Sequence, residues 1–540
     1  MASIAVPSAS TILVIGGGPG GSYSAAVLAR EGFDVVLLEA DKFPRYHVGE
    51  SQLASLRHFL RFIDLEKEFE EFGFQRKDGA GFKLNRHKRE GYTDFVSQDP
   101  NNFSWNTVRS QADELMLRHA SKCGAKVFEE TKVTELEFEG SEQSGHPVAA
   151  LWKQKSGATG RITFSYLVDA SGRNGIMSTR YLKNRQFNSL LKNVACWGYW
   201  EGTGKYLPGT SRENSPLFEA LADESGWAWF IPLHDGTTSV GIVMNQDISN
   251  EKKAKAKESG EDSSLVAHYL SELKRAPNVL ALIGDGVHIK KSDAPLVSAA
   301  SDYSYSATSY AGPHYRIVGD AGAFIDPYFS SGVHLAISGG LSAAATICAE
   351  MKGGCTSTEA IAWHSAKFFY AALCSRVLIA FLRFMLVVLS AYHQIKSQEA
   401  PVLSNKDEDN FDRAFDFFRP SKYRTDWTFI QGNTDVGRKL QGDDLRRTVE
   451  FCAKHAYEPS LPEERKELIE KFGDPLRVLP AESAEDSEQV ATEKRILKGV
   501  AIRKLMRTED IVHIDNFVAD NLLGYKLRLI RGSLGLEKVL

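Results

Sequence analysis

The first forty residues carry the pattern that most restricts the fold of this chain: a buried strand, a glycine-rich turn, a helix and a second strand. An apolar run at residues 11–15 is followed by the glycines of a G-x-G-x-x-G motif, Gly16, Gly18 and Gly21. Small and apolar residues predict a helix over 22–30, and residues 35–38 predict a strand that ends at Glu39. Such glycines let a pyrophosphate approach the helix N-terminus, and the carboxylate accepts hydrogen bonds from a ribose hydroxyl. The unit predicts a βαβ fold that binds a dinucleotide.

Two later motifs favour FAD over NAD as the nucleotide. Residues 167–173 indicate a strand ending in Asp-x-x-Gly, and residues 316–322 indicate a strand ending in Gly-Asp. Both are similar to motifs of flavoprotein monooxygenases, in which the second aspartate, here Asp320, holds the ribityl chain of FAD. Each motif alone is a common turn sequence, so it is their order after residues 16–39 that indicates a flavoprotein.

A narrower feature is the pair Trp227 and Trp229, which stand in an apolar stretch, residues 227–232, that predicts a strand. Side chains two residues apart in a strand point to the same face, so the two indoles would form a wall. Beside a flavin, that wall would keep an organic substrate away and leave room for a halide or an oxidant. The alternative is that both indoles fill a core, which is the more common position of buried tryptophan.

These motifs together resemble the flavin-dependent halogenases of the phenol-acting type found in fungal polyketide pathways. The resemblance covers roughly residues 9–400, and the tryptophan motif is its most specific part because that motif is rare in the related hydroxylases. It implies an α/β FAD-binding fold of the flavoprotein-monooxygenase type, with a βαβ dinucleotide-binding core, a substrate-side β-sheet and a helical C-terminal region. Further matching stretches are residues 43–51, Lys77 with Phe82, and residues 324–332.

The resemblance assigns the main catalytic role to Lys77, five residues before Phe82. A lysine there would capture hypohalous acid and aim it, either as an ammonium or, when neutral, as a chloramine. Burial in an apolar tunnel would lower its pKa and make both states accessible. The alternative is an ordinary solvated lysine, and Arg76 and Lys83 are further cations close by in the sequence.

The resemblance also implies roles for residues around the cofactor and the tunnel. Arg45 and Arg109 would contact FAD, although Arg109 with Asp113 also suits an ordinary i,i+4 pair on a helix surface. Glu50 and Ser51 would lie by the tunnel. The family often continues with an apolar residue and Leu-Pro-Ser, whereas this chain continues with Gln52, Leu53, Ala54 and Ser55.

The halide, chloride or bromide, would bind backbone N–H groups near Ser331 and Gly332, at the start of a helix predicted over 333–344. Successive amides at a helix start form a concave anion site. The alternative, that residues 330–332 merely cap the helix, is compatible with this role. No metal site is predicted, because the six cysteines show no metal-ligand spacing.

Composition predicts a cytoplasmic enzyme without a nucleic-acid partner. A net charge of −4 over 540 residues argues against nucleic acid, and cysteines without a paired framework suit a reducing compartment. Residues 1–10 lack the charged start of a secretory signal. The apolar segment 377–391 is shorter than a bilayer span and has Arg383 in its middle, which predicts a buried helix and no transmembrane segment. The alternative is a helix with an exposed apolar face that serves a partner or a membrane surface.

The chain is predicted to contain two regions. Residues 9–400 would form the halogenase domain, with a sheet on the substrate side built mainly from 80–104 and 190–300. The charged segment 250–264 is interpreted as a surface loop. Residues 401–540, which carry no chemical motif, would form a helical region that covers the substrate pocket.

The resulting hypothesis is an FAD-dependent halogenase, an oxidoreductase of secondary-metabolite biosynthesis. By resemblance, a separate flavin reductase supplies FADH2, oxygen gives the flavin C4a-hydroperoxide, and the halide becomes hypohalous acid that reaches Lys77. Chlorination of an electron-rich phenolic ring is expected, on a freestanding aromatic polyketide-type product, because the chain offers no extended basic patch for an acidic carrier protein. The alternatives are a hydroxylase or epoxidase on the same scaffold and a non-catalytic FAD-binding pathway partner.

Overall fold

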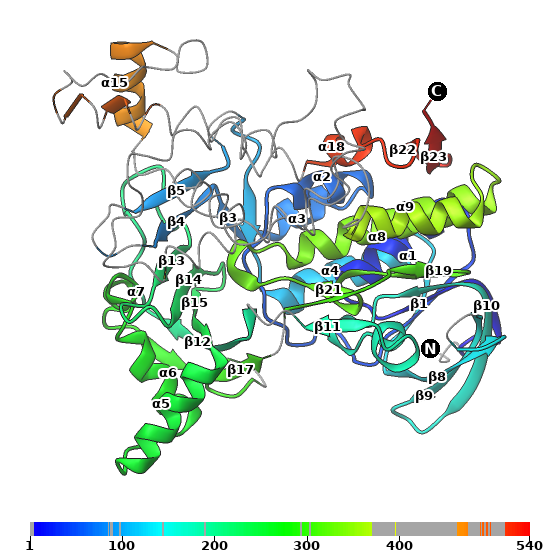
Figure 1. The fold of residues 1–540 in the computed structure, drawn as a ribbon, viewed down its shortest axis with the longest axis horizontal. Coiled ribbons are helices and arrows are strands. Elements are labelled where there is room, and N and C mark those ends of the chain that lie inside the picture. The colour runs from blue at the N-terminus through cyan, green and yellow to red at the C-terminus, as the bar shows by residue number, and fades with distance from the viewer. Residues whose placement is uncertain are drawn as a thin grey trace, which may run out of the picture.

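The computed structural model contains two large β-sheets with helices between and around them (Figure 1). It describes residues 5–369 apart from 85, 87–89, 97–98, 143–144, 188–190, 292–293 and 302–303, together with 395, 462–473, 487, 489–490, 493–494, 497 and 513–539. The predicted boundary at residue 400 and the predicted helix over 377–391 lie outside the described residues.

The first large sheet, on the right in Figure 1, contains the glycine-rich unit. Strands β20, β10, β1, β2 and β7 are parallel neighbours, β19 pairs antiparallel with β20, and β9 links β10 to β8. Their bounds are β1 Ala9–Ile15, β2 Val35–Leu38, β7 Lys126–Phe128, β8 Thr131–Glu139, β9 His146–Gln154, β10 Thr159–Asp169, β19 Ala311–Gly312 and β20 Tyr315–Ile317. Strand β1 is buried on both faces, since Ile12 and Leu13 pack in different cores, as expected for a central parallel strand.

Helix α1 (Pro19–Arg30) follows β1 at once and packs against the long helix α8 (Gly332–Met351). Glycine is required in the turn between β1 and α1, because Gly16 has φ of +100° and a Cβ on Gly21 would lie 1.9 Å from the Gly16 carbonyl oxygen. Among the described helices, α8 alone is long and apolar enough to cross a membrane, and 89% of its apolar window is buried inside the protein.

The second large sheet, on the left in Figure 1, takes strands from both 80–104 and 190–300. Its order is β16-β12-β15-β14-β13-β4-β5, with β17 also paired to β12. The bounds are β4 Gly79–Lys83, β5 Gly91–Asp94, β12 Asn193–Glu201, β13 Leu217–Ala220, β14 Gly226–Pro232, β15 Thr237–Asn245, β16 Val287–Ile289 and β17 Ser298–Ser301.

Strand β14 contains the tryptophan motif, and its side chains alternate between two cores. Trp227 and Trp229 pack in one cluster, whereas Ala228 and Phe230 pack in another on the opposite face. The indole of Trp229 lies across Gly241 of the neighbouring β15, where a Cβ would come within 2.3 Å of the ring. The predicted common face of the two tryptophans is thus present, and it depends on a glycine in the next strand.

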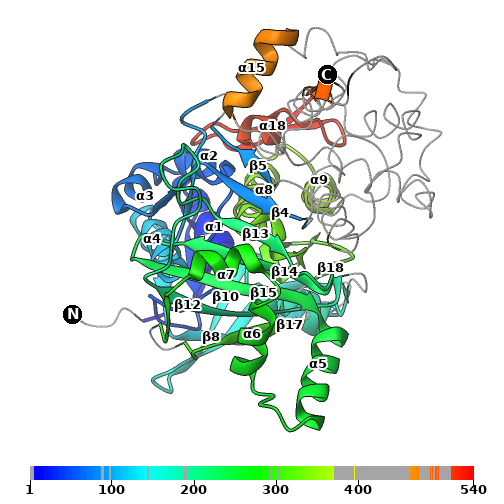
Figure 2. The same cartoon turned by 90° about the vertical axis from the view of Figure 1, so that its left-hand side faces the viewer.

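The other helices and short strands surround these sheets (Figures 1 and 2). The helices are α2 Ser55–Phe62, α3 Glu66–Phe72, α4 Arg109–Lys122, α5 Gln246–Glu258, α6 Leu265–Leu273, α7 Pro277–Ile283 and α9 Ser357–Phe369. The short strands pair as β3 Gln75–Lys77 with β6 Ser104–Asn106, and as β11 Arg185–Phe187, β18 Tyr305–Ala307 and β21 Ala323–Phe324.

The segment 250–264, expected to be a surface loop, is helical as far as Glu258. Helix α5 begins after Asn245, whose side-chain oxygen accepts hydrogen bonds from two backbone N–H groups of the first turn. Glu251 and Lys255 form an i,i+4 ion pair at 2.9 Å along its exposed side. The expectation was wrong because lysine, glutamate and alanine favour a helix even where no apolar face is buried.

The described C-terminal residues return to the nucleotide-binding core. Helices α15 (Pro462–Phe472) and α18 (Ile514–Ala519) precede a hairpin of β22 (Tyr525–Arg528) and β23 (Gly535–Lys538). Leu536 of this hairpin belongs to the same core cluster as α1 and α8. A helical region was predicted here, and the hairpin was not.

Candidate active site

The glycine-rich turn and Glu39 form a cradle that fits the adenosine diphosphate part of FAD. Gly18 is the N-cap of α1, and no side chain caps the first turn of that helix. The Glu39 carboxylate, just beyond β2, accepts hydrogen bonds from the N–H groups of Gly17 and Asp41. The open helix start suits a pyrophosphate, and the fixed carboxylate beside it suits ribose hydroxyls.

Asp113 joins the two arginines that the resemblance assigns to the cofactor. Arg109 makes a bidentate ion pair with Asp113 at 2.8 and 3.0 Å, and Arg45 contacts the same carboxylate at 3.1 Å. The Asp113 side chain is 1% exposed, so this is not the surface pair considered from the sequence. Arg109 also donates to the carbonyl oxygen of Val48 at 2.9 Å, which anchors the loop that leads to Glu50.

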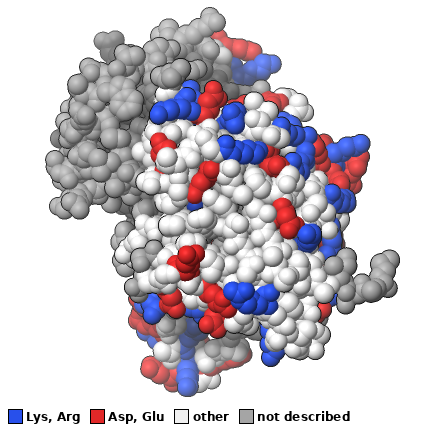
Figure 3. Space-filling model, turned by 90° about the vertical axis from the view of Figure 1, so that its right-hand side faces the viewer, with Lys and Arg blue, Asp and Glu red and all other residues white. Residues whose placement is uncertain are grey.

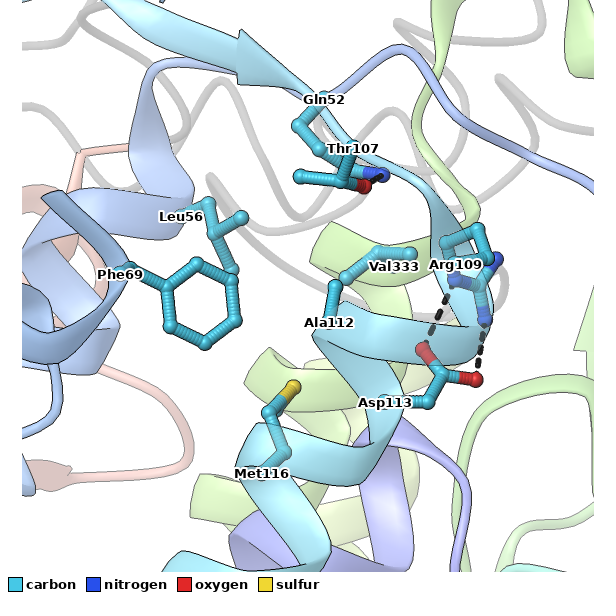
Figure 4. A pocket seen from close by; sticks show the side chains of 9 residues that line it. All are labelled: Gln52, Leu56, Phe69, Thr107, Arg109, Ala112, Asp113, Met116 and Val333. Carbon is cyan, nitrogen blue, oxygen red and sulfur yellow. Dashed lines mark hydrogen bonds and ion pairs between the residues drawn. The ribbon is translucent and has the colours of Figure 1, made fainter. Parts of the chain in front are cut away.

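A small pocket opens beside this ion pair, between α2, α3, α4 and the start of α8 (Figure 4). The lining is mostly apolar and consists of Gln52, Leu56, Phe69, Thr107, Arg109, Ala112, Asp113, Met116 and Val333. The two charged groups among these residues already pair with each other. We therefore interpret the pocket as a packing gap behind the ion pair and not as a substrate site.

Asp320 lies in a 3-10 turn directly after β20. Desolvation raises the pKa of this carboxyl to about 6, against the opposing charges of Arg109, Arg173 and Arg185. Arg185 and Tyr305 donate hydrogen bonds to its backbone carbonyl oxygen, at 3.3 and 2.7 Å. The turn is thereby fixed at the end of a parallel strand, where a carboxylate fits the ribityl hydroxyls of FAD.

Lys77 ends the short strand β3, and its side chain is buried. Its Nζ donates to Ser51 Oγ and to the carbonyl oxygen of Gln52, both at 2.8 Å, and lies 5.0 Å from the centroid of the Phe95 ring. Within the described part of the chain no carboxylate pairs with it, and burial lowers its pKa to about 7. Both the neutral amine and the ammonium are therefore populated near neutral pH.

Gln52, which stands where the family pattern often has an apolar residue, makes several hydrogen bonds. Its side-chain amide donates to the carbonyl oxygen of Gly49 at 2.9 Å and to Thr107 Oγ1 at 3.1 Å, and its backbone N–H donates to the carbonyl oxygen of Trp105 at 3.0 Å. Its own carbonyl oxygen accepts from Lys77. The polar side chain thus fastens the segment that holds the lysine.

The two tryptophans form one continuous aromatic surface with the loop before α8. Their ring centroids are 5.9 Å apart, and Trp229 Nε1 donates to Ser239 Oγ at 3.1 Å. Trp227 meets Tyr328 edge to face at 4.9 Å. Both indoles are buried. Their position fits both the predicted wall and the alternative that they fill a core.

The start of α8 is the predicted halide site. Ser331 is its N-cap, Gly332 is its first residue, and no side chain caps the first turn. Ser330 has φ of +57°, which turns the backbone just before the helix. Ser331 is buried. Uncapped amides at the start of a long helix suit a small anion.

Glu50 lies at the inner end of polar contacts that sequence reasoning missed. Its Oε1 accepts a hydrogen bond from the Tyr199 hydroxyl at 2.6 Å, and that hydroxyl contacts the Tyr46 hydroxyl at 3.1 Å. Burial raises the pKa of Glu50 above its ordinary value. Tyr46 lies inside the family-like stretch 43–51, but Tyr199 stands 149 residues from Glu50 and carries no local signal.

Several of the predicted site residues fall into three groups, whereas Asp320 after β20, the two tryptophans on β14, and Ser331 with Gly332 at the start of α8 stand on other elements. The glycines and Glu39 surround the start of α1, Arg45 and Arg109 meet at Asp113, and Lys77 meets Ser51. Among the described residues, Lys77 has hydrogen bonds or ring contacts with Ser51, Gln52 and Phe95 but with neither tryptophan. No group of three or more described His, Cys, Asp or Glu residues could hold a metal ion.

Comparison with known proteins identifies the family of this chain. An FAD-binding-domain family model matches residues 9–188. The flavin-dependent halogenase ascD of Acremonium egyptiacum is 50% identical over 99% of this chain and 93% of its own length, and the sulochrin halogenase gedL of Aspergillus terreus is 46% identical over 99% and 94%. The solved myxobacterial chondrochloren halogenase CndH superposes with a TM-score of 0.63 at 26% identity, over 83% of this chain and 97% of that one.

The fold and the cradle define an FAD-binding flavoenzyme. At this level of identity over its full length, the chain belongs to the flavin-dependent halogenases. The predicted family, the α/β FAD-binding fold and the class of enzyme are thus confirmed.

The lowered pKa of Lys77 predicts how stability depends on pH. A lysine side chain in the unfolded chain has a pKa of about 10.4. Between pH 7 and that value the unfolded chain therefore binds more protons than the folded chain. The free energy of unfolding should rise with pH over this range. At about pH 7 the Lys77→Met variant should have a free energy of unfolding a few kcal/mol higher than that of the wild type. This difference should be smaller at about pH 9.5. Urea unfolding at both pH values measures it, with the exposed neighbour variant Arg76→Gln as control. An advantage that does not change with pH would contradict the buried amine.

Proposed function

We propose that this protein halogenates an electron-rich phenolic ring of a freestanding aromatic polyketide-type product, with chloride as the expected halide and bromide as the alternative. The observation that carries the proposal is the buried Lys77 amine, held by Ser51 and by a backbone carbonyl oxygen, with a pKa of about 7. A structural lysine would be expected to reach solvent or a carboxylate, because burying an unpaired cation is costly. A lysine that is instead kept partly neutral suits capture of an electrophilic halogen.

The other residues have supporting roles in this proposal. Bound reduced FAD, supplied by a separate reductase, provides the oxygen activation that converts halide to hypohalous acid. The start of α1, Glu39, the Arg45–Asp113–Arg109 cluster and Asp320 hold the cofactor. The amides at Ser331 hold the halide, and Lys77 orients the oxidant by hydrogen bonding to it. The proposed location is the cytoplasm.

The tryptophans favour halogenation over hydroxylation. A hydroxylase requires the organic substrate beside the flavin, whereas the Trp227 ring packs against Tyr328 of the halide loop and the Trp229 ring packs against Trp227. We propose that these rings keep the phenol away while a small oxidant passes. The non-catalytic alternative is less well supported, because Gln52 keeps the partners of Lys77 in place instead of disrupting them.

The role of Lys77 predicts that Lys77→Ala abolishes halogenation, with a loss of at least about 10²-fold, while FAD binding is retained. The assay supplies FAD, a flavin reductase, chloride or bromide, and a panel of phenols, and mass spectrometry follows the products. Arg76→Gln is the matched control, since Arg76 is the exposed neighbour on the same strand. Substantial halogenation by Lys77→Ala would remove the lysine from the mechanism, and a gain of one oxygen by the wild type would identify a hydroxylase.

The barrier role predicts that replacing both Trp227 and Trp229 by alanine raises the release of hydrogen peroxide per halogenated product, with some hydroxylation. Trp200→Ala is the control, because that indole packs on His288 and bonds Tyr269, away from the two rings. Thermal unfolding and FAD binding would show whether each variant is intact. Unchanged coupling in an intact double variant would mean that the indoles only fill the core.

The surface charges favour a free substrate over one attached to an acidic carrier protein. The face shown in Figure 3 has charges of both signs interspersed and no extended basic area. On α5, Lys252 pairs with Asp223 and Glu272, and Lys255 pairs with Glu251, so both of these lysines have acidic partners. The expected result is faster turnover of a free phenol than of the same phenol loaded on a carrier. A strong preference for the loaded form would overturn this choice.

A further inference from the structure

Four side chains form a continuous hydrogen-bonded line from the surface to Glu50. Trp197 Nε1 lies 2.7 Å from the Tyr46 hydroxyl, Tyr46 lies 3.1 Å from the Tyr199 hydroxyl, and Tyr199 lies 2.6 Å from Glu50 Oε1. Tyr46 is 37% exposed, whereas Glu50 is 2% exposed. The line therefore runs from a partly exposed tyrosine to a buried carboxyl group through two phenol oxygens.

The chemistry of these groups fixes the direction of the line. An indole N–H only donates, so the oxygen of Tyr46 is an acceptor toward Trp197. Tyr199 donates to Glu50, so its oxygen is free to accept the proton of Tyr46. With Tyr199 donating to Glu50, this arrangement lets both O–H groups point inward, from Tyr46 to Tyr199 to Glu50, and the Tyr46 hydroxyl also hydrogen-bonds Ser298.

Two separate parts of the chain build this line. Trp197 and Tyr199 stand two apart on β12 and share one face of the substrate-side sheet. Tyr46 and Glu50 belong to the loop anchored by Arg109. The residue after Glu50 is Ser51, whose hydroxyl oxygen accepts from Lys77. The inner end of the line therefore lies next to the residue that holds the lysine.

The overall reaction requires such a connection. Halogenation of an aromatic C–H by halide, oxygen and reduced FAD forms one carbon–halogen bond, oxidised FAD and two molecules of water. Hydrogen and charge balance only if one proton is consumed with each halide anion. The proposed halide site and Lys77 are both buried, so this proton must cross the protein to reach them.

We propose that Tyr46, Tyr199 and Glu50 are the proton inlet of this halogenase, and that Trp197 is a positioning residue that orients the inlet. This inference rests on the proposed function. In each turnover, the Tyr199 O–H breaks as the Glu50 O–H forms, a proton from Tyr46 restores Tyr199, and a proton from bulk water restores Tyr46. The Glu50 O–H then breaks as its proton goes to the oxygen that leaves as water, and Glu50 returns to a carboxylate. No electrons move, and no other reactant is needed.

The surroundings of Glu50 suit a group that takes up and releases a proton. Burial raises its pKa, while the Tyr199 hydrogen bond, the Gly49 N–H and the charge of Arg109 on α4 oppose that rise. Lys291 Nζ lies 4.9 Å from the centroid of the Tyr199 ring, and its charge is balanced by Asp235 at 2.6 Å.

The first test needs no turnover. Infrared titration of the full chain, as the difference between wild type and Glu50→Gln, follows the carboxyl stretch of Glu50 against pH. Tyr199→Phe should raise the pKa of Glu50, because it removes a hydrogen bond that stabilises the carboxylate. Tyr269→Phe is the matched control: Tyr269 is buried on the opposite face of the same sheet, and its hydroxyl also makes two hydrogen bonds. An unshifted titration in Tyr199→Phe would overturn the proposal.

The second test measures halogenation in a single turnover with a phenol that the wild type accepts. Tyr199→Phe and Tyr46→Phe should each slow product formation by about tenfold or more and alter its pH profile and solvent isotope effect, and small external acids should partly rescue Tyr46→Phe. Tyr269→Phe should stay within about twofold of the wild type. Near-UV circular dichroism and FAD binding would confirm that all variants are folded.

The outcomes separate the two hypotheses. If the wild type halogenates and Tyr199→Phe matches Tyr269→Phe in rate, pH profile and isotope effect, the inlet is overturned and the proposed function stands. If the wild type halogenates no phenol, the proposed function fails and the inlet is overturned with it, whatever the titration gives.

Discussion

Burial of the Lys77 amine, which has no carboxylate partner among the described residues, is the constraint on which this site depends. A protonated amine there costs free energy, and the cost is limited by two hydrogen bonds to Ser51 and to the carbonyl oxygen of Gln52. Those acceptors lie in a loop with no regular secondary structure. The loop must therefore be held by its neighbours, and much of the surrounding structure serves that end.

The neighbours that hold the loop come from both halves of the fold. From the nucleotide-binding side, Arg109 on α4 binds the carbonyl oxygen of Val48. From the substrate side, Tyr199 on β12 binds Glu50. The segment between residues 43 and 52 thus connects the cofactor cradle to the sheet that carries the tryptophans. A change in either half would reach the lysine through this segment.

How much of this could be read from the sequence depends on the range of each interaction. The glycine turn, Glu39 and the common face of Trp227 and Trp229 follow from local periodicity, and the sequence predicted them. The role of Gln52, the burial of Asp113 and the partnership of Tyr199 with Glu50 arise from residues far apart in the chain, which no local pattern encodes. The lysine itself was found only by resemblance, since nothing in its local sequence indicates that it is buried.

The C-terminal hairpin has a consequence for how the chain is made. Leu534 and Leu536 complete the apolar core around α8, and Glu31, at the end of α1, accepts hydrogen bonds from the backbone N–H groups of Gly532 and Leu534. The core around α1 and α8 therefore contains residues that are far apart in the chain. The cofactor cradle can therefore be fully consolidated only after this hairpin has been synthesised and packed against α8.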